Sequence, residues 1–251
     1  MPLTEAESMP STNQFLLDAA GQGAPEGALA VAGSQSAGRG RQRRLWHSPA
    51  GRNLYFSLLL WPQVPMERFP QLALLAALAL RRAVLSQEPS LAVGLKWPND
   101  LWLEGRKLSG ILCECPAEAN ADGRRGIVLG VGLNVNSLEE DFLPELRDIA
   151  TSLKWHAGDD FSRELLLAEF CNSFQELYDL WQKSEDLSPF LKEWQENDVL
   201  KGRTITLQRP TDLLTGTVVG YTPQGFMLLR TEAGTETVSV GDVHILKGNV
   251  G

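Results

Sequence analysis

The apolar positions divide the chain into a long first part of helices and strands and a short last part of strands alone. Between Asp160 and Lys183, apolar residues recur at three- and four-residue steps, which predicts an amphipathic helix. The segment from Pro70 to about Gln87 is apolar on nearly all sides, so it predicts a buried helix packed against a sheet. A further helix is expected to begin at Ser11, which can cap it, with Gln14 completing a capping box.

Strands are expected where runs of apolar and β-branched residues lie between turn residues. In the first part these runs are Leu29–Ala32, Asn53–Trp61, Leu91–Leu95, Leu101–Leu103, Lys107–Cys115 and Gly126–Asn136. After a short helix near Pro189–Gln195, five runs follow at 204–208, 214–220, 226–231, 236–240 and 243–246. The change near Leu200 predicts two domains, 1–198 and 199–251, the second a small barrel-like β domain.

One predicted hairpin carries a lysine on each arm. Leu101 and Leu103 share one side of its first arm, Glu104-Gly105 suits a tight turn, and Lys96 and Lys107 lie among apolar neighbours. A lysine on a mostly buried strand is costly unless an anion meets it or its long stem carries the charge to solvent. Cys113 and Cys115, two residues apart, are expected to pack into the core from one face of the second arm.

The stretch from Gly38 to Pro49 has four arginines and no acidic residue. A solvated charged loop is the simplest interpretation. However, the loop lies between predicted strands, and arginines crowded on a glycine-rich backbone repel one another unless anions intervene. Phosphate is the natural guest, because a guanidinium binds it through two parallel hydrogen bonds.

Gly130 and Gly132 remove side chains from one face of a predicted strand. This allows a flat ligand or another backbone to approach closely, although a bulge or a crowded helix contact would also explain the pair. The pattern is not a dinucleotide fingerprint, because the third glycine is absent and no helix follows directly.

Composition narrows the function class. The 251 residues carry a net charge of −8, with a pI near 5.0, so a global nucleic-acid footprint is not expected. The most apolar segment, Leu72–Leu80, is too short to span a bilayer, and the N-terminus does not read as a signal peptide. Three cysteines make no disulfide framework and the histidines are scattered, so we expect no protein-held metal and a cytoplasmic setting.

Four motifs in order resemble those of the bacterial biotin protein ligases, over nearly the whole chain from about Met9. They are Ser11-Thr12-Asn13; Gly38-Arg39-Gly40-Arg41 with Trp46 and Ser48-Pro49; Lys96–Asp100 followed by Arg106–Leu112; and Gly130-Val131-Gly132-Leu133-Asn134. Each motif alone would be weak, but the ordered set is specific.

The resemblance implies activation of biotin with MgATP to biotinyl-5′-adenylate. The biotinyl group then passes to one lysine of a biotin carboxyl carrier protein, as in acetyl-CoA carboxylase. It also implies an α+β fold, in which a class II synthetase-like mixed β-sheet flanked by helices is followed by a small SH3-like C-terminal domain. Mg²⁺ would come with ATP, held largely by phosphates and water. A homodimer joined at a sheet edge is left open.

The resemblance also implies roles for particular residues. Lys107, Arg39 and Arg41 would be catalytic, with Lys107 contacting the biotin carboxyl and the α-phosphate and the arginines closing over the adenylate. The residues implied to bind biotin are Ser11, Thr12, Asn13, Gln35, Gly38, Arg39, Gly40, Arg41, Lys107, Gly110, Gly130 and Gly132. Those implied to bind ATP are Arg39, Arg41, Arg44, Trp46, Asn99, Lys107 and Asn134. Lys96 keeps a structural role.

The chain departs from the family pattern in three places. The family loop commonly reads Gly-Arg-Gly-Arg-Arg-Gly, whereas Gln42 and Arg43 fill the last two places here. Only ten residues precede Ser11, so we expect no N-terminal DNA-binding domain and no DNA partner. Gly220-Tyr221-Thr222 replaces the commoner Gly-Ile-Asp in the last part.

Two other functions stay open from the sequence. One is a lipoate or octanoate ligase or transferase of related fold. The other is a polyanion-binding module without catalysis, in which the arginines of residues 38–44 grip RNA or a similar partner. The acidic net charge disfavours the second.

Overall fold

A seven-stranded sheet forms the centre of the larger part of the protein. The computed structural model describes residues 2–208, 212–239 and 241–245. The sheet runs in the order β1-β2-β3-β7-β6-β5-β4, with β1 and β2 parallel and all other neighbours antiparallel, so it is mixed as predicted. Its strands are β1 Leu3–Ala6, β2 Leu29–Ala32, β3 Leu54–Leu60, β4 Gly94–Lys96, β5 Asp100–Leu103, β6 Arg106–Glu114 and β7 Ile127–Leu133.

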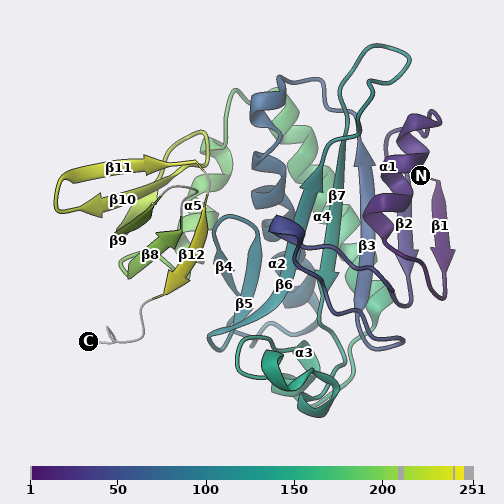
Figure 1. Cartoon of the computed structure of the whole chain (residues 1–251), viewed down its shortest axis with the longest axis horizontal. Helices are drawn as coiled ribbons and strands as arrows, with labels where there is room; N and C mark the ends of the chain where they lie inside the picture. The colour runs from purple at the N-terminus through teal and green to yellow at the C-terminus, as the bar shows by residue number, and fades with distance from the viewer. Residues whose placement is uncertain (1, 209–211, 240, 246–251) are drawn as a thin grey trace.

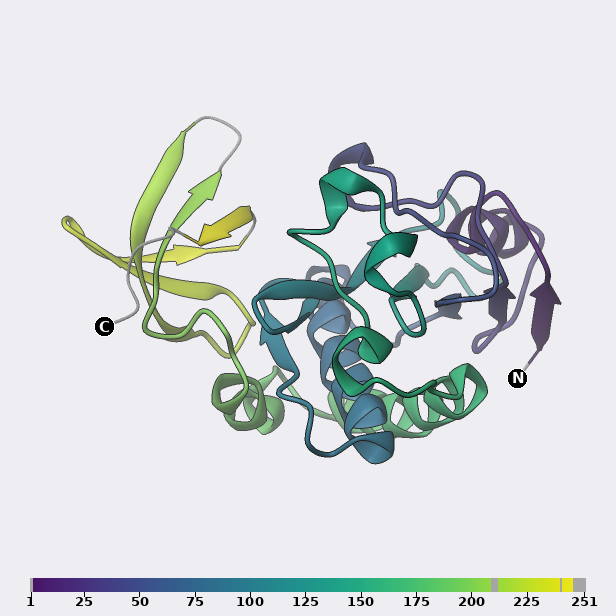
Figure 2. The same ribbon diagram turned by 90° about the horizontal axis from the view of Figure 1, so that it is seen from below.

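Helices cover both faces of this sheet. Figures 1 and 2 show α2 and α4 on one face and α1 with the connecting loops on the other. The helices are α1 Thr12–Gly21, α2 Gln71–Gln87, α3 Leu153–Ala157, α4 Arg163–Lys183 and α5 Ser188–Glu196. Together they leave one loop-covered face of β6 and β7 beside α1, where the four sequence motifs come together.

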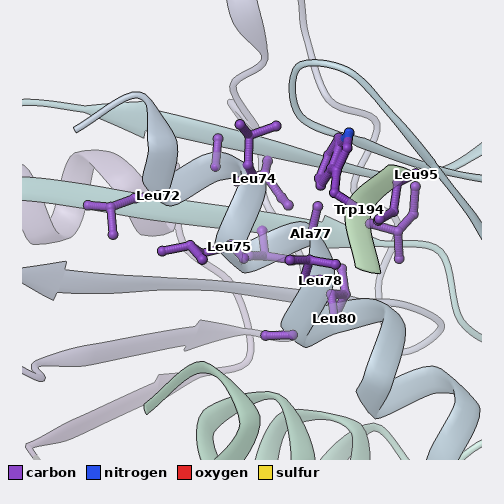
Figure 3. Close-up of a cluster of buried hydrophobic side chains, with 14 of the residues drawn as sticks. Leu72, Leu74, Leu75, Ala77, Leu78, Leu80, Leu95 and Trp194 are labelled. Atoms are coloured by element: carbon purple, nitrogen blue, oxygen red, sulfur yellow. The ribbon is translucent and has the colours of Figure 1, made fainter. Parts of the chain in front are cut away.

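The main core lies between the sheet and α2. Helix α2 is buried along almost its whole length, which confirms the prediction from its all-round apolar sequence. Figure 3 shows its leucines and Ala77 meeting Leu95 of β4 and Trp194 of α5. Truncating one such leucine costs about 2–5 kcal/mol, because the cavity left behind adds to the lost transfer free energy.

Strand β6 contains a bulge that decides which way its side chains point. Leu101 pairs with Ser109, but the next residue, Trp102, pairs with Lys107, so Leu108 is an extra residue in β6. Side chains alternate along a strand, and one extra residue reverses the alternation. Lys107 therefore shares the open face with Gly110, while Ile111 points into the core.

The last part of the chain forms a second, five-stranded antiparallel sheet in the order β11-β10-β9-β8-β12. Its strands are β8 Thr204–Gln208, β9 Leu213–Tyr221, β10 Met227–Thr231, β11 Gly234–Val238 and β12 Asp242–Ile245. Each of the five predicted runs overlaps one of these strands, and the predicted ends at 240 and 246 lie outside the described residues. Trp97 Nε1 donates to Gly225 O at 3.0 Å, and Tyr221 OH donates to Asp198 Oδ2 at 2.8 Å. These bonds attach the second sheet to the turn between β4 and β5 and to the end of α5.

Several local predictions were wrong. Ser11 does cap α1, but Gln14 Oε1 accepts from Arg39 rather than from the backbone N–H of Ser11, so no capping box forms. Cys113 packs against the core, whereas Cys115 lies beyond the end of β6 and is exposed. Strand β1 was not predicted; it has little apolar character and forms through backbone pairing with β2.

Glu104 and Gly105 have φ of 49° and 76°, so the predicted tight turn is confirmed. In the described part of the chain, no helix is both long and apolar enough to cross a membrane.

Candidate active site

Lys107 is the central cation of the candidate site. Its Nζ lies 2.7 Å from Asp100 Oδ1, across the β5–β6 hairpin, and 5.6 Å from the centre of the Trp46 ring. A Cβ built on Gly110 would lie 3.1 Å from Lys107 Nζ, so the lysine extends over this glycine. The bulge in β6 places it there, on the side of the sheet that carries the arginine loop.

The two lysines of the hairpin have different surroundings. Lys96 Nζ lies 4.0 Å from the centre of the Trp102 ring, which is a cation–π contact. This agrees with a structural role for Lys96. The structure thus separates two residues that look equivalent in the sequence.

A polar cluster from α1 and its neighbours lies on the same face. Ser57 Oγ is within hydrogen-bond distance of both Thr12 Oγ1 (2.7 Å) and Asn13 Oδ1 (2.6 Å). Gln35 accepts from Thr12 N at 2.9 Å and donates to Ser48 Oγ at 3.1 Å. The amides and hydroxyls of this cluster are mostly buried, so their orientations are fixed by one another rather than by solvent.

The glycines of β7 make room for side chains from other segments, and they do not mark a bulge. The pairing of β7 with both neighbours is continuous through Gly130 and Gly132, so the bulge interpretation is wrong there. A Cβ on Gly130 would lie 1.8 Å from Asn13 Oδ1, and one on Gly132 would lie 2.4 Å from Trp46 Nε1. Gly38 is also tightly packed, since a Cβ built on it would lie 2.5 Å from Trp46 O.

Trp46 presents a buried donor to this face. Its Nε1 has no hydrogen-bond acceptor among the described residues. Leaving such a donor unsatisfied costs about 1–3 kcal/mol, which an acceptor on a ligand would offset. Together with the charged Lys107, the indole makes this face a receptor for an anionic, hydrogen-bonding molecule.

The arginine loop, residues 38–48, is held by specific contacts rather than by solvent. Arg39 donates to Glu114 Oε1 at 2.6 Å and to Gln14 Oε1 at 2.7 Å. Arg41 donates to Asn99 Oδ1 at 3.1 Å and to Gly241 O, directly before β12, at 3.4 Å. The loop therefore connects α1 and the end of β6 with the turn before β5.

The departure from the family loop has a structural consequence. Residues Arg41–Arg43 form a short 3₁₀ turn, in which Gln42 and Arg43 have φ of 54° and 60°. Only glycine adopts this left-handed region without cost, and other residues pay about 1–2 kcal/mol. Arg43 thus occupies a left-handed backbone position where the common family sequence has a glycine, and Gln42 occupies one where it has an arginine. Arg44 donates to Gln42 Oε1 at 3.3 Å.

The two asparagines lie at the edges of the site. Asn99 is buried, donates to Ile111 O at 2.6 Å and accepts from Arg41. Asn134 is also buried and donates to Thr151 O at 2.9 Å. Their amides therefore fix the backbone of β6 and of the segment before α3.

Sequence reasoning missed four residues of this arrangement. They are Asp100, Glu114, Ser57 and Gln14. Asp100 is the last residue of one motif and Glu114 lies two residues after another, and a charged residue at each of these places was an available signal. Nothing in the sequence marks Ser57 or the bond from Arg39 to Gln14, since these depend on how separate segments meet.

Cys113 on β6 is the titratable thiol beside the candidate site. Burial raises the pKa of Cys113 to about 12, so its thiol stays protonated. Among the described residues, no three His, Cys, Asp or Glu side chains are grouped closely enough to hold a metal ion.

Comparison with known families decides the relationship. Residues 5–134 match the biotin/lipoate A/B protein ligase family, and residues 201–246 match the biotin protein ligase C-terminal domain. This chain belongs to the biotin/lipoate A/B protein ligase family. The first match covers every candidate site residue named from the sequence.

Two relatives and one solved structure in this family illustrate the similarity. The chain is 34% identical to the bifunctional ligase/repressor BirA of Bacillus subtilis over 94% of this chain and 71% of BirA. It is 30% identical to the biotin–[acetyl-CoA-carboxylase] ligase of Paracoccus denitrificans over 93% of this chain and 96% of that protein. The fold matches the biotin protein ligase from Aquifex aeolicus in complex with biotin and ATP, with a TM-score of 0.85, 28% identity and coverage of 98% and 99%.

Proposed function

We propose that this protein is an ATP-dependent biotin–carrier-protein ligase. The observation that carries the proposal is the position of Lys107, over Gly110 and beside Trp46 on the sheet face that carries the arginine loop. The Paracoccus denitrificans relative is named a biotin–[acetyl-CoA-carboxylase] ligase and the Bacillus subtilis relative a bifunctional ligase/repressor, which supports the same reaction here. The substrates would be biotin, MgATP and a biotin carboxyl carrier protein.

The first half-reaction joins two anions. The biotin carboxylate oxygen attacks the α-phosphorus of ATP, the bond to the β-phosphate oxygen breaks, and pyrophosphate leaves. Lys107 supplies positive charge where the carboxylate and the α-phosphate approach, and this charge is already oriented by Asp100. Mg²⁺ enters with ATP as part of the substrate.

The second half-reaction transfers the biotinyl group. The ε-amine of a carrier lysine attacks the carbonyl carbon of the adenylate. The bond between that carbon and the phosphate oxygen breaks, and AMP leaves. The amine loses its proton to solvent. Lys107 again lies near the charge that develops. Closure of the arginine loop would exclude water from the mixed anhydride until the carrier arrives.

The polar cluster and the arginine loop are assigned to different parts of the substrates. We assign the biotin ring to the side of the site formed by Ser11, Thr12, Asn13 and Gln35, whose amides and hydroxyls match a ureido group. We assign the nucleotide to the side of Trp46 and Asn99. Arg39 and Arg41 would reach the phosphate between them. Asn134 would act by fixing the segment at Thr151.

The direct test combines the pure protein with labelled biotin, MgATP and a biotin carboxyl carrier domain. Label transferred to the carrier, and absent when ATP or biotin is omitted, supports the proposal. No label on the carrier, where a known biotin ligase transfers it under the same conditions, contradicts it.

The family model also covers lipoate ligases, so a lipoate or octanoate substrate is the second candidate. Thermal unfolding with biotin and with lipoate separates the two, because the substrate that binds the folded protein raises its melting temperature. A polyanion-binding module is disfavoured, because the net charge of −8 repels a polyanion.

Three further parts of the proposal concern organisation. We assign residues 1–198 to a catalytic domain and 199–251 to an SH3-like domain. We place the protein in the cytoplasm, which accords with the free state of all three cysteines. Sizing the protein with and without biotin plus ATP would test a homodimer.

A further inference from the structure

Glu114, the last residue of β6, joins two parts of the candidate site that come from distant segments. Its Oε2 accepts from Asn13 Nδ2 at 2.9 Å, and its Oε1 accepts from Arg39 Nη2 at 2.6 Å. Asn13 also donates to Leu112 O at 3.3 Å and is bonded through its Oδ1 to the buried hydroxyl of Ser57. One carboxylate therefore links the polar cluster to the arginine loop.

The same bulge that turns Lys107 toward the site also places Glu114 there. Beyond Leu108 the alternation of β6 puts Gly110 and Glu114 on the open face. Lys107 and Glu114 thus lie near opposite ends of one strand face, one cationic and one anionic. The arginine loop is bonded to the anionic end through Arg39.

The pair is too exposed to matter mainly for folding. The Arg39 and Glu114 side chains are 38% and 22% exposed, and pairs of this kind contribute about 0.2–1 kcal/mol. Its effect is instead geometric, because a guanidinium held at two acceptors has lost most of its rotamer freedom. A ligand anion that then binds it pays less ordering entropy.

We propose that Glu114 is a positioning residue, which holds Arg39 and Asn13 in register and so keeps the arginine loop over the site before the ligand binds. Arg39 keeps further N–H groups for the ligand's anion while it is bonded to Glu114. The chemistry of this inference rests on the proposed function, whereas the loop ordering rests on the contacts alone. Glu114 acts through Arg39 and Asn13 and itself touches no reacting atom.

The test is the variant Glu114→Gln, which keeps the shape of the side chain and removes its charge. The matched control is Glu118→Gln, an exposed glutamate in the loop that follows β6. Trypsin cleaves after arginine, so the initial rate of cleavage within residues 38–48 of the ligand-free protein reports how well the loop is held. This readout needs no substrate, and it therefore stands even if biotin is not the substrate.

We expect Glu114→Gln to be cleaved in the loop about fivefold faster than wild type, with Glu118→Gln unchanged. With biotin, MgATP and carrier, KM for biotin rises about fivefold while kcat of adenylation stays within about twofold, which corresponds to roughly 1 kcal/mol of lost pre-ordering. For Glu114→Asp, which keeps the charge on a shorter side chain, we expect a loop-cleavage rate and a KM for biotin between those of wild type and Glu114→Gln. Loop cleavage equal to that of the control, or a loss confined to kcat, would overturn the inference.

Discussion

Lys107 and Asp100 form an ion pair of 2.7 Å across the β5–β6 hairpin. Asp100 lies at the start of β5, directly after Asn99, and its side chain is mostly buried. The carboxylate fixes the direction of the lysine and neutralises its charge on a half-buried face. When an anionic substrate arrives, the lysine is therefore already aimed, and its remaining N–H groups can meet the substrate oxygens.

Replacing Lys107 by Ala should lower the rate of adenylate formation by roughly 10²- to 10³-fold, because it removes a pre-oriented charge from the reacting centre. Lys96→Ala is the matched control, since Lys96 packs over Trp102 on the other arm. It should reduce the rate by less than about threefold. Pyrophosphate release with biotin and MgATP measures both. Similar losses in the two variants would mean that the roles within the hairpin are misassigned.

Replacing Gly130 by Ala should weaken biotin binding about tenfold and cost about 1–3 kcal/mol of stability. The new Cβ would overlap Asn13 Oδ1, and Asn13 cannot turn away without losing its bonds to Ser57 and Glu114. Gly21→Ala is the control, because nothing lies within 4 Å of a Cβ at that position. Calorimetric titration with biotin and urea unfolding measure the two effects. Unchanged biotin affinity in Gly130→Ala would remove Asn13 from the binding site.

Replacing Arg39 by Gly should increase the release of free biotinyl-adenylate severalfold. The substitution removes both contacts that tie the start of the loop to Glu114 and Gln14, so the loop closes less often over the intermediate. Arg43→Ala, at an exposed position of the same loop, serves as the control. Chromatography of the adenylate in solution, after mixing without carrier, measures the effect. Retention equal to that of the control would contradict the role assigned to loop closure.

Replacing Asp198 by Asn should change how stability depends on pH. Burial raises the pKa of Asp198, against the opposing hydrogen bonds from Leu200 N and Tyr221 OH. The folded state therefore disfavours the charged form, and stability from this group is lost as pH rises from about 3.9 through the raised pKa. Asp198→Asn removes that loss, so its stability relative to wild type should increase with pH and then level off.

Urea unfolding of wild type and Asp198→Asn between pH 4 and pH 7 measures the difference in their free energies of unfolding. The contributions of the other titrating groups are the same in both proteins and cancel in this difference. Lys201→Gln is a useful comparison, because it removes the charge of an exposed neighbour and keeps the backbone hydrogen bond from residue 201 to Asp198. A stability difference between wild type and Asp198→Asn that is independent of pH would show that Asp198 does not titrate differently in the folded state.

Much of the architecture followed from local pattern. The all-round apolar sequence of α2 and the apolar stripe of α4 can be removed from water only by packing into the core. Both helices and their core positions were therefore predicted correctly. The five short runs after Leu200 likewise formed a separate sheet. Strand β1 was missed because its pairing with β2 comes from backbone bonds, which leave no side-chain signal.

The set of chemical groups can be read from the amino-acid sequence: two hairpin lysines, a glycine-rich arginine loop, a polar helix start and two glycines in a strand. Which of these groups meet depends on how distant segments pack. Simple alternation along β6 would have turned Lys107 toward Ile111 and the core. The extra residue at Leu108 reverses it and brings Lys107, Gly110 and Glu114 to one face. A bulge depends on the register between two strands, and register is fixed by pairing and packing across the whole sheet rather than by any one segment.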